Sequence, residues 1–149
     1  MSDLQTRLKK YEGTKEYQTK MKYYRNGKFY PYADSLGYQT IGYGHLITRG
    51  ENYQTGITEV IADELLNHDI LIAQNNLDTL DIWLPNDWRD FMVIMIFQLG
   101  LTGIQKFQRM LKALKERNYT EAIKQAKDSR WYKQTPNRVD QMISELTNK

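Results

Sequence analysis

KMKYYRNGKFYPYADSLGYQTIGYGHLI, residues 20–47, is rich in aromatic residues and is interrupted by glycines. Asn26-Gly27 lies between two aromatic runs, where an Asn-Gly pair is the strongest short-range signal for a β-hairpin. We therefore expect a small antiparallel sheet here. The sequence on both sides has helical periodicity, so the whole chain is predicted to have an α+β fold.

The segment before the sheet is predicted to be a short helix. Apolar residues recur at helical spacing over residues 4–11, Ser2 and Asp3 are suitable N-caps, and Gly13 is a stop signal. We expect this first helix to end at Glu12.

A long helix is predicted after the sheet, with Thr58 as its N-cap. Its buried face is predicted to consist of apolar residues that recur along it: Ile61, Leu65, Ile72 and Leu77. The next helix opens at Pro85 and reads DWRDFMVIMIFQLG up to Gly100; because it is apolar nearly all round, we expect a core helix. Further helices are expected over 103–116, over 119–128 and after Pro136.

Length and composition fit one compact unit with an ordinary hydrophobic core. The chain has 149 residues, of which 40% are hydrophobic, and no cysteine. These counts exclude a disulfide framework, a thiol nucleophile and a thiolate metal site. Two histidines argue against a histidine-rich metal site. The sequence predicts no metal and no cofactor.

Charge is distributed unevenly along the chain. Residues 101–149 carry eleven Lys and Arg against five Asp and Glu, whereas residues 31–100 carry two against ten. A basic C-terminal part favours an anionic polymer as partner, and both the bacterial wall and nucleic acid qualify. An ordinary solvated surface accounts for the same pattern.

The sequence gives no sign of a membrane-spanning segment. The longest apolar run, Phe91–Phe97, is far shorter than the roughly 20 residues that cross a bilayer. The first residues, MSDLQTRLKKYEG, lack the apolar core of a secretory signal. We expect no membrane insertion, and a separate route outward if the substrate lies beyond the cytoplasmic membrane.

Glu12 and Asp34 are candidates for the two carboxyl groups that cleave a glycosidic bond. One such group protonates the leaving oxygen, and the other assists the attack from the opposite face. Glu12 is expected where a helix ends against a sheet, where partial burial can keep a carboxyl protonated. Asp34 opens a turn at the rim of the sheet, and taken alone it fits a turn-forming aspartate better.

Thr40 follows Asp34 by six positions, across the predicted turn. In a hairpin the two side chains can lie close enough to hold one water between them. Taken alone, Thr40 reads as a strand residue with high β propensity.

Four motifs resemble those of the T-even phage lysozyme family, in the family's order and over most of the chain. They are Glu12-Gly13, YADSLGYQTIGYGHLIT at 32–48, FQLGLTGIQKF at 97–107 and SRWYKQTPNR at 129–138. TIGYGHLIT and SRWYKQTPNR in one chain are highly specific.

The resemblance implies an α+β, lysozyme-like fold with a single domain over residues 1–149. A small antiparallel β lobe at about 13–57 and a larger helical lobe at about 79–149 would flank the substrate cleft. The helical lobe would include helix 1–12, and a long helix at about 58–78 would join the lobes.

The implied activity is that of a muramidase. Such an enzyme hydrolyses the β-1,4 bond between N-acetylmuramic acid and N-acetylglucosamine in peptidoglycan, here with inversion, and serves phage lysis of a bacterial host. Carried over by position, Glu12 is the general acid, Asp34 is the second carboxylate, and Thr40 helps to position the attacking water.

The resemblance also implies substrate-binding positions. Leu46, Phe97 and Gln98 match residues that line the cleft, although core packing accounts equally well for Leu46 and Phe97. Arg138 resembles the arginine that pairs with the catalytic glutamate. The implied partner is peptidoglycan and not nucleic acid, and the protein is expected to be a monomer. It would be made in the host cytoplasm and reach the periplasm through a holin or a similar route.

Some conspicuous residues are given structural roles. His45 and Asp69 match a family pair regarded as a salt bridge, and His68 is expected to face solvent. The three tryptophans are expected to fill the core rather than to stack on sugars: Trp83, Trp88 and Trp131.

The chain departs from the family between the two carboxylates, which lie 22 positions apart. The extra residues, EYQTKMKYYRNGKF at 16–29, are predicted to form most of an added hairpin. Because antiparallel strands return the chain to its starting point, Asp34 need not move away from Glu12. The aromatic and basic residues of this hairpin suggest contact with substrate or with a partner.

Two alternative functions stay open. A non-catalytic module would bind glycan or nucleic acid through the hairpin at Lys20–Tyr32. A lytic transglycosylase needs the acid but not a second carboxylate. The presence of Glu12, Asp34 and Thr40 together favours hydrolysis.

Overall fold

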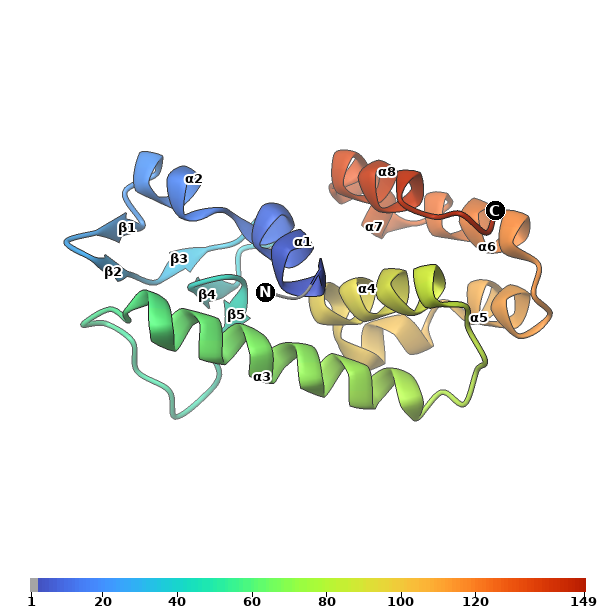
Figure 1. Cartoon of the computed structure of the whole chain (residues 1–149), viewed down its shortest axis with the longest axis horizontal. Helices are drawn as coiled ribbons and strands as arrows, with labels where there is room; N and C mark the ends of the chain where they lie inside the picture. The colour runs from blue at the N-terminus through green and yellow to red at the C-terminus, as the bar shows by residue number, and fades with distance from the viewer. Residues whose placement is uncertain (1–2) are drawn as a thin grey trace. The chain divides into compact units, whose positions relative to one another are not determined.

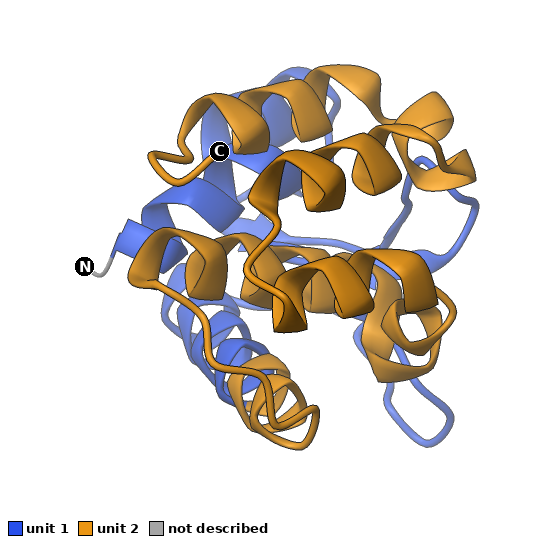
Figure 2. Ribbon diagram, turned by 90° about the vertical axis from the view of Figure 1, so that its right-hand side faces the viewer, with its two compact units in different colours: residues 1–71 blue, residues 72–149 orange. Residues whose placement is uncertain are grey.

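The computed structural model describes residues 3–149 and divides into two compact units. Unit 1 ends at Leu71 and unit 2 begins at Ile72 (Figure 2). Unit 1 combines short strands with helices, whereas the secondary structure of unit 2 is helical (Figure 1). The expected α+β class is confirmed.

The first helix, α1 (Asp3–Glu12), ends where the sequence predicts. Its Leu8 is fully buried, and the N–H of Gly13 donates to the carbonyl of Lys9 at 3.0 Å, which closes the last turn. The proposed cap Ser2 lies outside the described residues. The chain leaves α1 directly after Glu12.

A second helix, α2 (Lys15–Lys20), corrects the expectation that residues 16–29 form most of a hairpin. Thr14 caps this helix, and its Oγ1 accepts a hydrogen bond from the N–H of Tyr17 at 3.1 Å. Residues 15–29 are therefore a helix followed by a shorter hairpin.

The hairpin consists of β1 (Tyr24–Arg25) and β2 (Lys28–Phe29), which pair antiparallel. Asn26 and Gly27 have φ angles of 53° and 74°, the left-handed values that a two-residue hairpin turn requires. Phe29 is fully buried and exchanges two backbone hydrogen bonds with Ile57. The predicted Asn-Gly turn is confirmed.

Three further strands form a separate sheet in the order β3 (Tyr32–Ala33), β4 (Gln39–Ile41) and β5 (His45–Leu46). The predicted antiparallel pairing is thus present, divided between two small sheets. Pro31 lies between β2 and β3 and has no N–H to donate, so the chain changes course there without continuing the ladder.

The long helix α3 (Glu59–Asp78) begins after Thr58, whose Oγ1 accepts from the N–H of Ile61 at 3.4 Å. Its buried face is formed by residues at helical spacing: Ala62, Leu66, Ile70, Ala73 and Leu77. Ile61 and Ile72 are exposed, so their predicted burial is wrong.

Helix α4 (Asn86–Gln105) supplies much of the core of unit 2, as predicted. Its buried residues are Trp88, Phe91, Met92, Val93, Ile94, Met95, Ile96 and Ile104. Gly100 has φ 75° and ψ 166°, so the helical path is interrupted there, which agrees with the predicted stop.

The remaining helices are α5 (Gln108–Lys115), α6 (Tyr119–Lys127), α7 (Arg130–Gln134) and α8 (Pro136–Ser144). Helix α5 starts later than the predicted 103–116, because the chain breaks at Lys106 and Phe107 after α4.

The tryptophans do not all behave as predicted. Trp88 and Trp131 are buried, as expected. Trp83 is 62% exposed, so its predicted burial is wrong. It lies in the segment between α3 and α4, and the guanidinium carbon of Arg117 lies 4.5 Å from the centre of its ring.

Among residues 3–149, no single helix is long and apolar enough to cross a membrane. Helices α4 and α5 reach the required length and composition only as a pair, which is bent by 103°.

Candidate active site

The Glu12 side chain packs against Gly44, in the turn between β4 and β5. A β-carbon added to Gly44 would lie 2.7 Å from Cγ of Glu12 and 2.9 Å from its Oε2, closer than real β-carbons approach. Gly44 also has a φ of +83°, which favours glycine. The TIGYGH motif therefore offers bare backbone where the Glu12 carboxyl lies.

The main chain of Glu12 is tied to the same turn through Tyr32. The Tyr32 hydroxyl donates to the carbonyl of Gly42 at 3.3 Å and lies 3.5 Å from the carbonyl oxygen of Glu12. Burial, and then the charge of Glu12, raise the pKa of Tyr32 above its usual value. The hydroxyl therefore remains a donor at neutral pH.

Thr40 stands opposite both Tyr32 and Leu46 in the sheet. Residues directly opposite in antiparallel strands point to the same face, so these three side chains share one face. Because the Tyr32 hydroxyl reaches the Glu12 carbonyl, the end of α1 lies over this face. Thr40 is buried, whereas Leu46 is 50% exposed and is not a core residue.

Asp34 belongs to this face as well. Its N–H donates to the carbonyl of Tyr38 at 2.9 Å, so the two residues continue the β3–β4 ladder. Asp34 is two residues beyond Tyr32, and Tyr38 is two residues before Thr40, so all four point the same way. Asp34 and Thr40 are thus diagonal neighbours, a relation that typically separates α-carbons by roughly 7–8 Å.

The Asp34 carboxylate also organises its own turn. Its Oδ1 accepts the N–H of Leu36 at 2.9 Å and the N–H of Tyr38 at 2.8 Å. These bonds show that Asp34 stabilises the turn, and they also fix the position of its carboxylate.

Gln18, in α2, is a site residue that sequence reasoning missed. Its side chain is 1% exposed, and its Nε2 donates to the carbonyls of Gly13 at 3.0 Å and Gly42 at 2.9 Å. A glutamine in a short polar helix gives no sequence signal of burial. The Thr14 cap is the one local feature that could have revealed the helix.

The remaining predicted site residues belong to unit 2. Phe97 and Gln98 lie near the end of α4 and are partly exposed. The Oε1 of Gln98 accepts the indole N–H of the buried Trp131 at 2.8 Å, which orients the amide. Arg138 lies in α8, and its predicted pairing with Glu12 stays a prediction.

The predicted ion pair of His45 and Asp69 is confirmed. The Nδ1 of His45 lies 2.7 Å from Asp69, and its Nε2 lies 3.0 Å from the carboxylate of Glu51. The hydrogen bond to Asp69 makes the largest contribution to raising the His45 pKa, against the effect of burial. His68 is exposed, as predicted.

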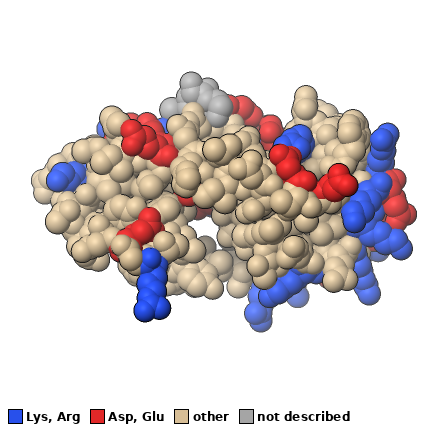
Figure 3. Space-filling view, turned by 90° about the horizontal axis from the view of Figure 1, so that it is seen from below, with Lys and Arg blue, Asp and Glu red and all other residues tan. Residues whose placement is uncertain are grey.

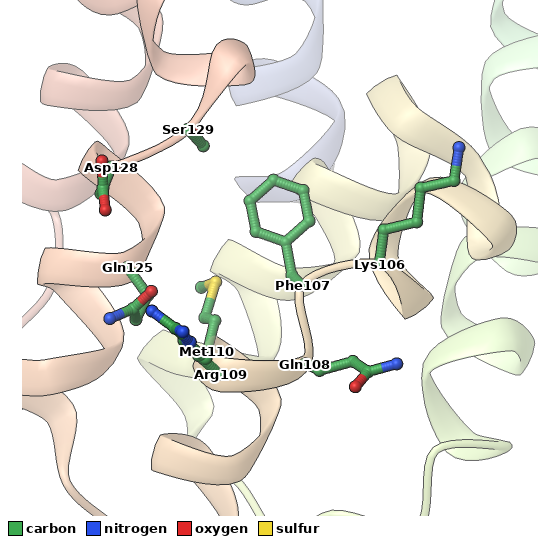
Figure 4. Close-up of a pocket in the computed structure, with 8 residues that line it drawn as sticks. All are labelled: Lys106, Phe107, Gln108, Arg109, Met110, Gln125, Asp128 and Ser129. Atoms are coloured by element: carbon green, nitrogen blue, oxygen red, sulfur yellow. The ribbon is translucent and has the colours of Figure 1, made fainter.

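Unit 2 carries a pocket of about 380 Å³ (Figure 4). It is lined by Lys106, Phe107, Gln108, Arg109, Met110, Gln125, Asp128 and Ser129. Figure 3 shows Lys and Arg side chains gathered on the part of the visible face that unit 2 forms. The basic C-terminal segment of the sequence therefore places cations at the surface.

Within residues 3–149, no group of three or more His, Asp and Glu side chains is arranged to hold a metal ion. The absence of a cofactor stays a prediction.

Comparison with known proteins identifies the family. Residues 6–148 match the family described as phage lysozyme. The chain belongs to the phage lysozyme family. Its α+β fold is accordingly lysozyme-like, and the protein is a glycoside hydrolase of the lysozyme type, a muramidase.

Three related proteins show the extent of the similarity. Probable T4-type lysozymes 1 and 2 of Dictyostelium discoideum are 30% and 28% identical to this lysozyme over 151 residues, which cover 83% of this chain and 89% of each relative. The pre-baseplate central spike protein Gp5 of Enterobacteria phage T4 is 29% identical over 137 residues, which cover 74% of this chain and 24% of that protein.

Proposed function

We propose that this lysozyme hydrolyses the β-1,4 bond between N-acetylmuramic acid and N-acetylglucosamine in peptidoglycan, with inversion at the anomeric carbon. Glu12 is the general acid, and Asp34 and Thr40 position the attacking water. One observation carries the proposal: Glu12 ends a helix that lies over the sheet face bearing Asp34 and Thr40.

Glu12 protonates the leaving oxygen as the glycosidic C–O bond breaks. Its carboxyl lies against the backbone of Gly44, which limits the positions it can adopt. A general acid must meet the leaving oxygen within hydrogen-bond distance, so restricting the carboxyl favours the productive geometry.

Thr40 is suited to accept a hydrogen bond from the water. Its hydroxyl already donates to the carbonyl of Tyr38 at 2.9 Å, which leaves the oxygen lone pairs as acceptors. Asp34 uses Oδ1 for its turn, so Oδ2 can accept the other hydrogen of the water. A water that donates to both groups directs its own lone pair at the anomeric carbon, and Asp34 takes the released proton.

Substrate binding is assigned to Leu46 on the sheet face and to Phe97 and Gln98 in unit 2. The exposure of Leu46 supports contact, and the Trp131 indole holds the Gln98 amide so that its NH₂ group can bind an N-acetyl carbonyl. Arg138 is assigned to pairing with Glu12.

We infer a role in lysis of a bacterial host by a phage. The enzyme would act as a monomer, without a cofactor and without binding nucleic acid. It would be made in the host cytoplasm and reach the wall through a holin or a similar route. Clearing of permeabilised bacteria by the purified protein tests the lytic role, and intact cells that stay turbid until a holin is supplied test the route.

Mass spectrometry of digested peptidoglycan tests the reaction. A hydrolase leaves reducing muramic acid ends, each heavier by one water than the anhydro ends that a lytic transglycosylase leaves. Early NMR spectra should show the α anomer first if the reaction inverts. Predominantly anhydro products would contradict hydrolysis while sparing the role of Glu12, and absence of any cleavage would favour a binding module.

A further inference from the structure

Gln18 is a buried polar side chain in α2, the helix that follows Glu12 and Gly13. Its Nε2 donates to two backbone carbonyls, those of Gly13 and Gly42. An amide NH₂ group has two hydrogens in one plane, and here each hydrogen meets one acceptor. The reversed amide would place an oxygen against both carbonyls, so these contacts fix its orientation.

The two acceptors belong to the backbone segments that adjoin Glu12. Gly13 follows Glu12 in the chain, and Gly42 begins the turn whose Gly44 packs against the Glu12 side chain. One amide therefore joins the end of α1 to the backbone that the carboxyl touches.

The surrounding contacts hold Gln18 in place. Thr14 caps α2, and the carbonyl of Gln18 accepts the N–H of Tyr23 at 2.8 Å. The Tyr23 ring stacks on Tyr32 with centroids 4.6 Å apart and planes inclined by 5°. The added helix and the hairpin that follows it are thus connected to the same Gly42 turn by two routes.

Keeping Gln18 buried has a cost. Its Oε1 has no hydrogen-bond partner among residues 3–149, and an unsatisfied buried acceptor is unfavourable. A leucine or methionine at this position would avoid that cost, so the two donated bonds must offset it.

We propose that Gln18 is a positioning residue that holds Glu12 in its catalytic position by tying Gly13 to the Gly42–Gly44 turn. This inference rests on the proposed role of Glu12 as general acid. It assigns the added α2 segment a part in catalysis in place of the ligand contact that the sequence suggests.

The test compares Gln18→Met with the wild type on soluble peptidoglycan oligomers, by counting new reducing ends. Methionine has a similar length and no donor, so kcat should fall by about 10- to 100-fold while KM changes little. Leu114→Ala, a substitution at a fully buried residue of α5, is the control for lost stability. Its kcat should stay close to wild type well below its Tm.

Gln18→Glu supplies a second readout. A protonated carboxylic acid can donate one hydrogen bond, but a carboxylate cannot donate and would face two carbonyl oxygens. The activity of Gln18→Glu relative to the wild type should therefore rise as the pH falls, when it is measured at each pH well below the Tm of the variant, where the protein is fully folded.

The outcomes separate this inference from the proposed function. If Glu12→Gln is inactive but Gln18→Met keeps its kcat within twofold of the wild type, Gln18 does not position Glu12. The same holds if Gln18→Glu matches the wild type at every pH. If Glu12→Gln is active, the proposed general acid itself is wrong.

Discussion

Gly44 and Glu12 occupy adjoining space that leaves no room for another side chain. Gly44→Ala should lower both activity and stability, because the new methyl group would meet Cγ of Glu12 at 2.7 Å and the φ of +83° strains alanine. Gly50→Ala is a matched control, since Gly50 has a φ of +94° and nothing lies within 4 Å of an added β-carbon.

Both variants should lose about 1 kcal/mol of unfolding free energy from backbone strain. Only Gly44→Ala should also lose activity, by at least about tenfold, since Glu12 must move. Urea unfolding and reducing-end assays measure the two effects. Equal activity of the two variants would mean that Glu12 tolerates displacement.

Asp34 can be tested separately from its turn. In Asp34→Asn the side-chain oxygen can still accept the N–H groups of Leu36 and Tyr38, so the Tm should stay close to wild type. The negative charge that takes the water proton is lost, and activity should fall about 10²- to 10⁴-fold. A fully active Asp34→Asn enzyme would exclude Asp34 as the second carboxylate.

At the scale of single residues, chemistry and motif agree on Glu12 and Asp34, and their catalytic roles stay predictions. Both could be proposed from the sequence because each role needs a carboxyl at a marked position, a helix end or a turn. Gln18 was not identifiable, since its role depends on two backbone carbonyls that only the fold brings together. Trp83 was misjudged because aromatic character alone does not show whether any element covers it.

At the scale of elements, α2 and the β1–β2 hairpin contribute packing. The Tyr24 and Phe29 rings pack in a tilted arrangement, with centroids 4.6 Å apart and planes inclined by 60°. The Nζ of Lys15 lies 5.0 Å from the centre of the Tyr24 ring. The Tyr30 ring lies 3.9 Å from the guanidinium carbon of Arg25 and packs on Gly56. These contacts are within unit 1, so the aromatic residues have structural partners.

Tyr24→Ser should therefore lower the free energy of unfolding by about 1–3 kcal/mol with little change in KM, because removal of the Tyr24 ring leaves Phe29 partly uncovered. Tyr24→Phe should remain close to wild type, since the ring is kept. Thermal unfolding measures the change in stability, and steady-state kinetics measure KM. A raised KM at unchanged Tm would restore the sequence-based hypothesis of ligand contact.

Element boundaries were predictable where caps and stops marked them. Thr58 and Gly100 bounded helical segments as expected, and Asn26-Gly27 formed the hairpin turn. Helix α2 was missed because its six residues include one apolar side chain, that of Tyr17, and so have no apolar repeat. The buried face of α3 was misassigned because Ala62 and Ala73, rather than the larger Ile61 and Ile72, face the core.

At the scale of the whole molecule, the cluster formed by His45, Glu51 and Asp69 predicts how stability depends on pH. The His45 pKa is raised chiefly by Asp69. Protonated His45 therefore stabilises the fold fully below about pH 6.5, and this stabilisation is lost as the pH rises through the raised pKa. Burial opposes ionisation of Glu51, but hydrogen bonds from Thr48, Tyr53 and His45 lower its pKa to about 2. That contribution is present above pH 4.5 and is lost as the pH falls towards 2.

The cluster should therefore stabilise the fold most between about pH 4.5 and 6.5. Urea unfolding across pH should show a fall in the free energy of unfolding on the alkaline side, and Asp69→Asn should flatten that fall. A wild-type curve that keeps rising above pH 7 in parallel with Asp69→Asn would contradict this account.

The most direct test of the central claim is the rate at which wild-type enzyme and Glu12→Gln release reducing ends from peptidoglycan, measured where both are folded. Glutamine keeps the shape of the side chain but has no acidic proton to give to the leaving oxygen. We predict a rate lower by at least about 10²- to 10⁴-fold, with circular dichroism and Tm near those of the wild type. A Glu12→Gln enzyme that retains its rate within about tenfold would contradict the assignment of Glu12 as the general acid.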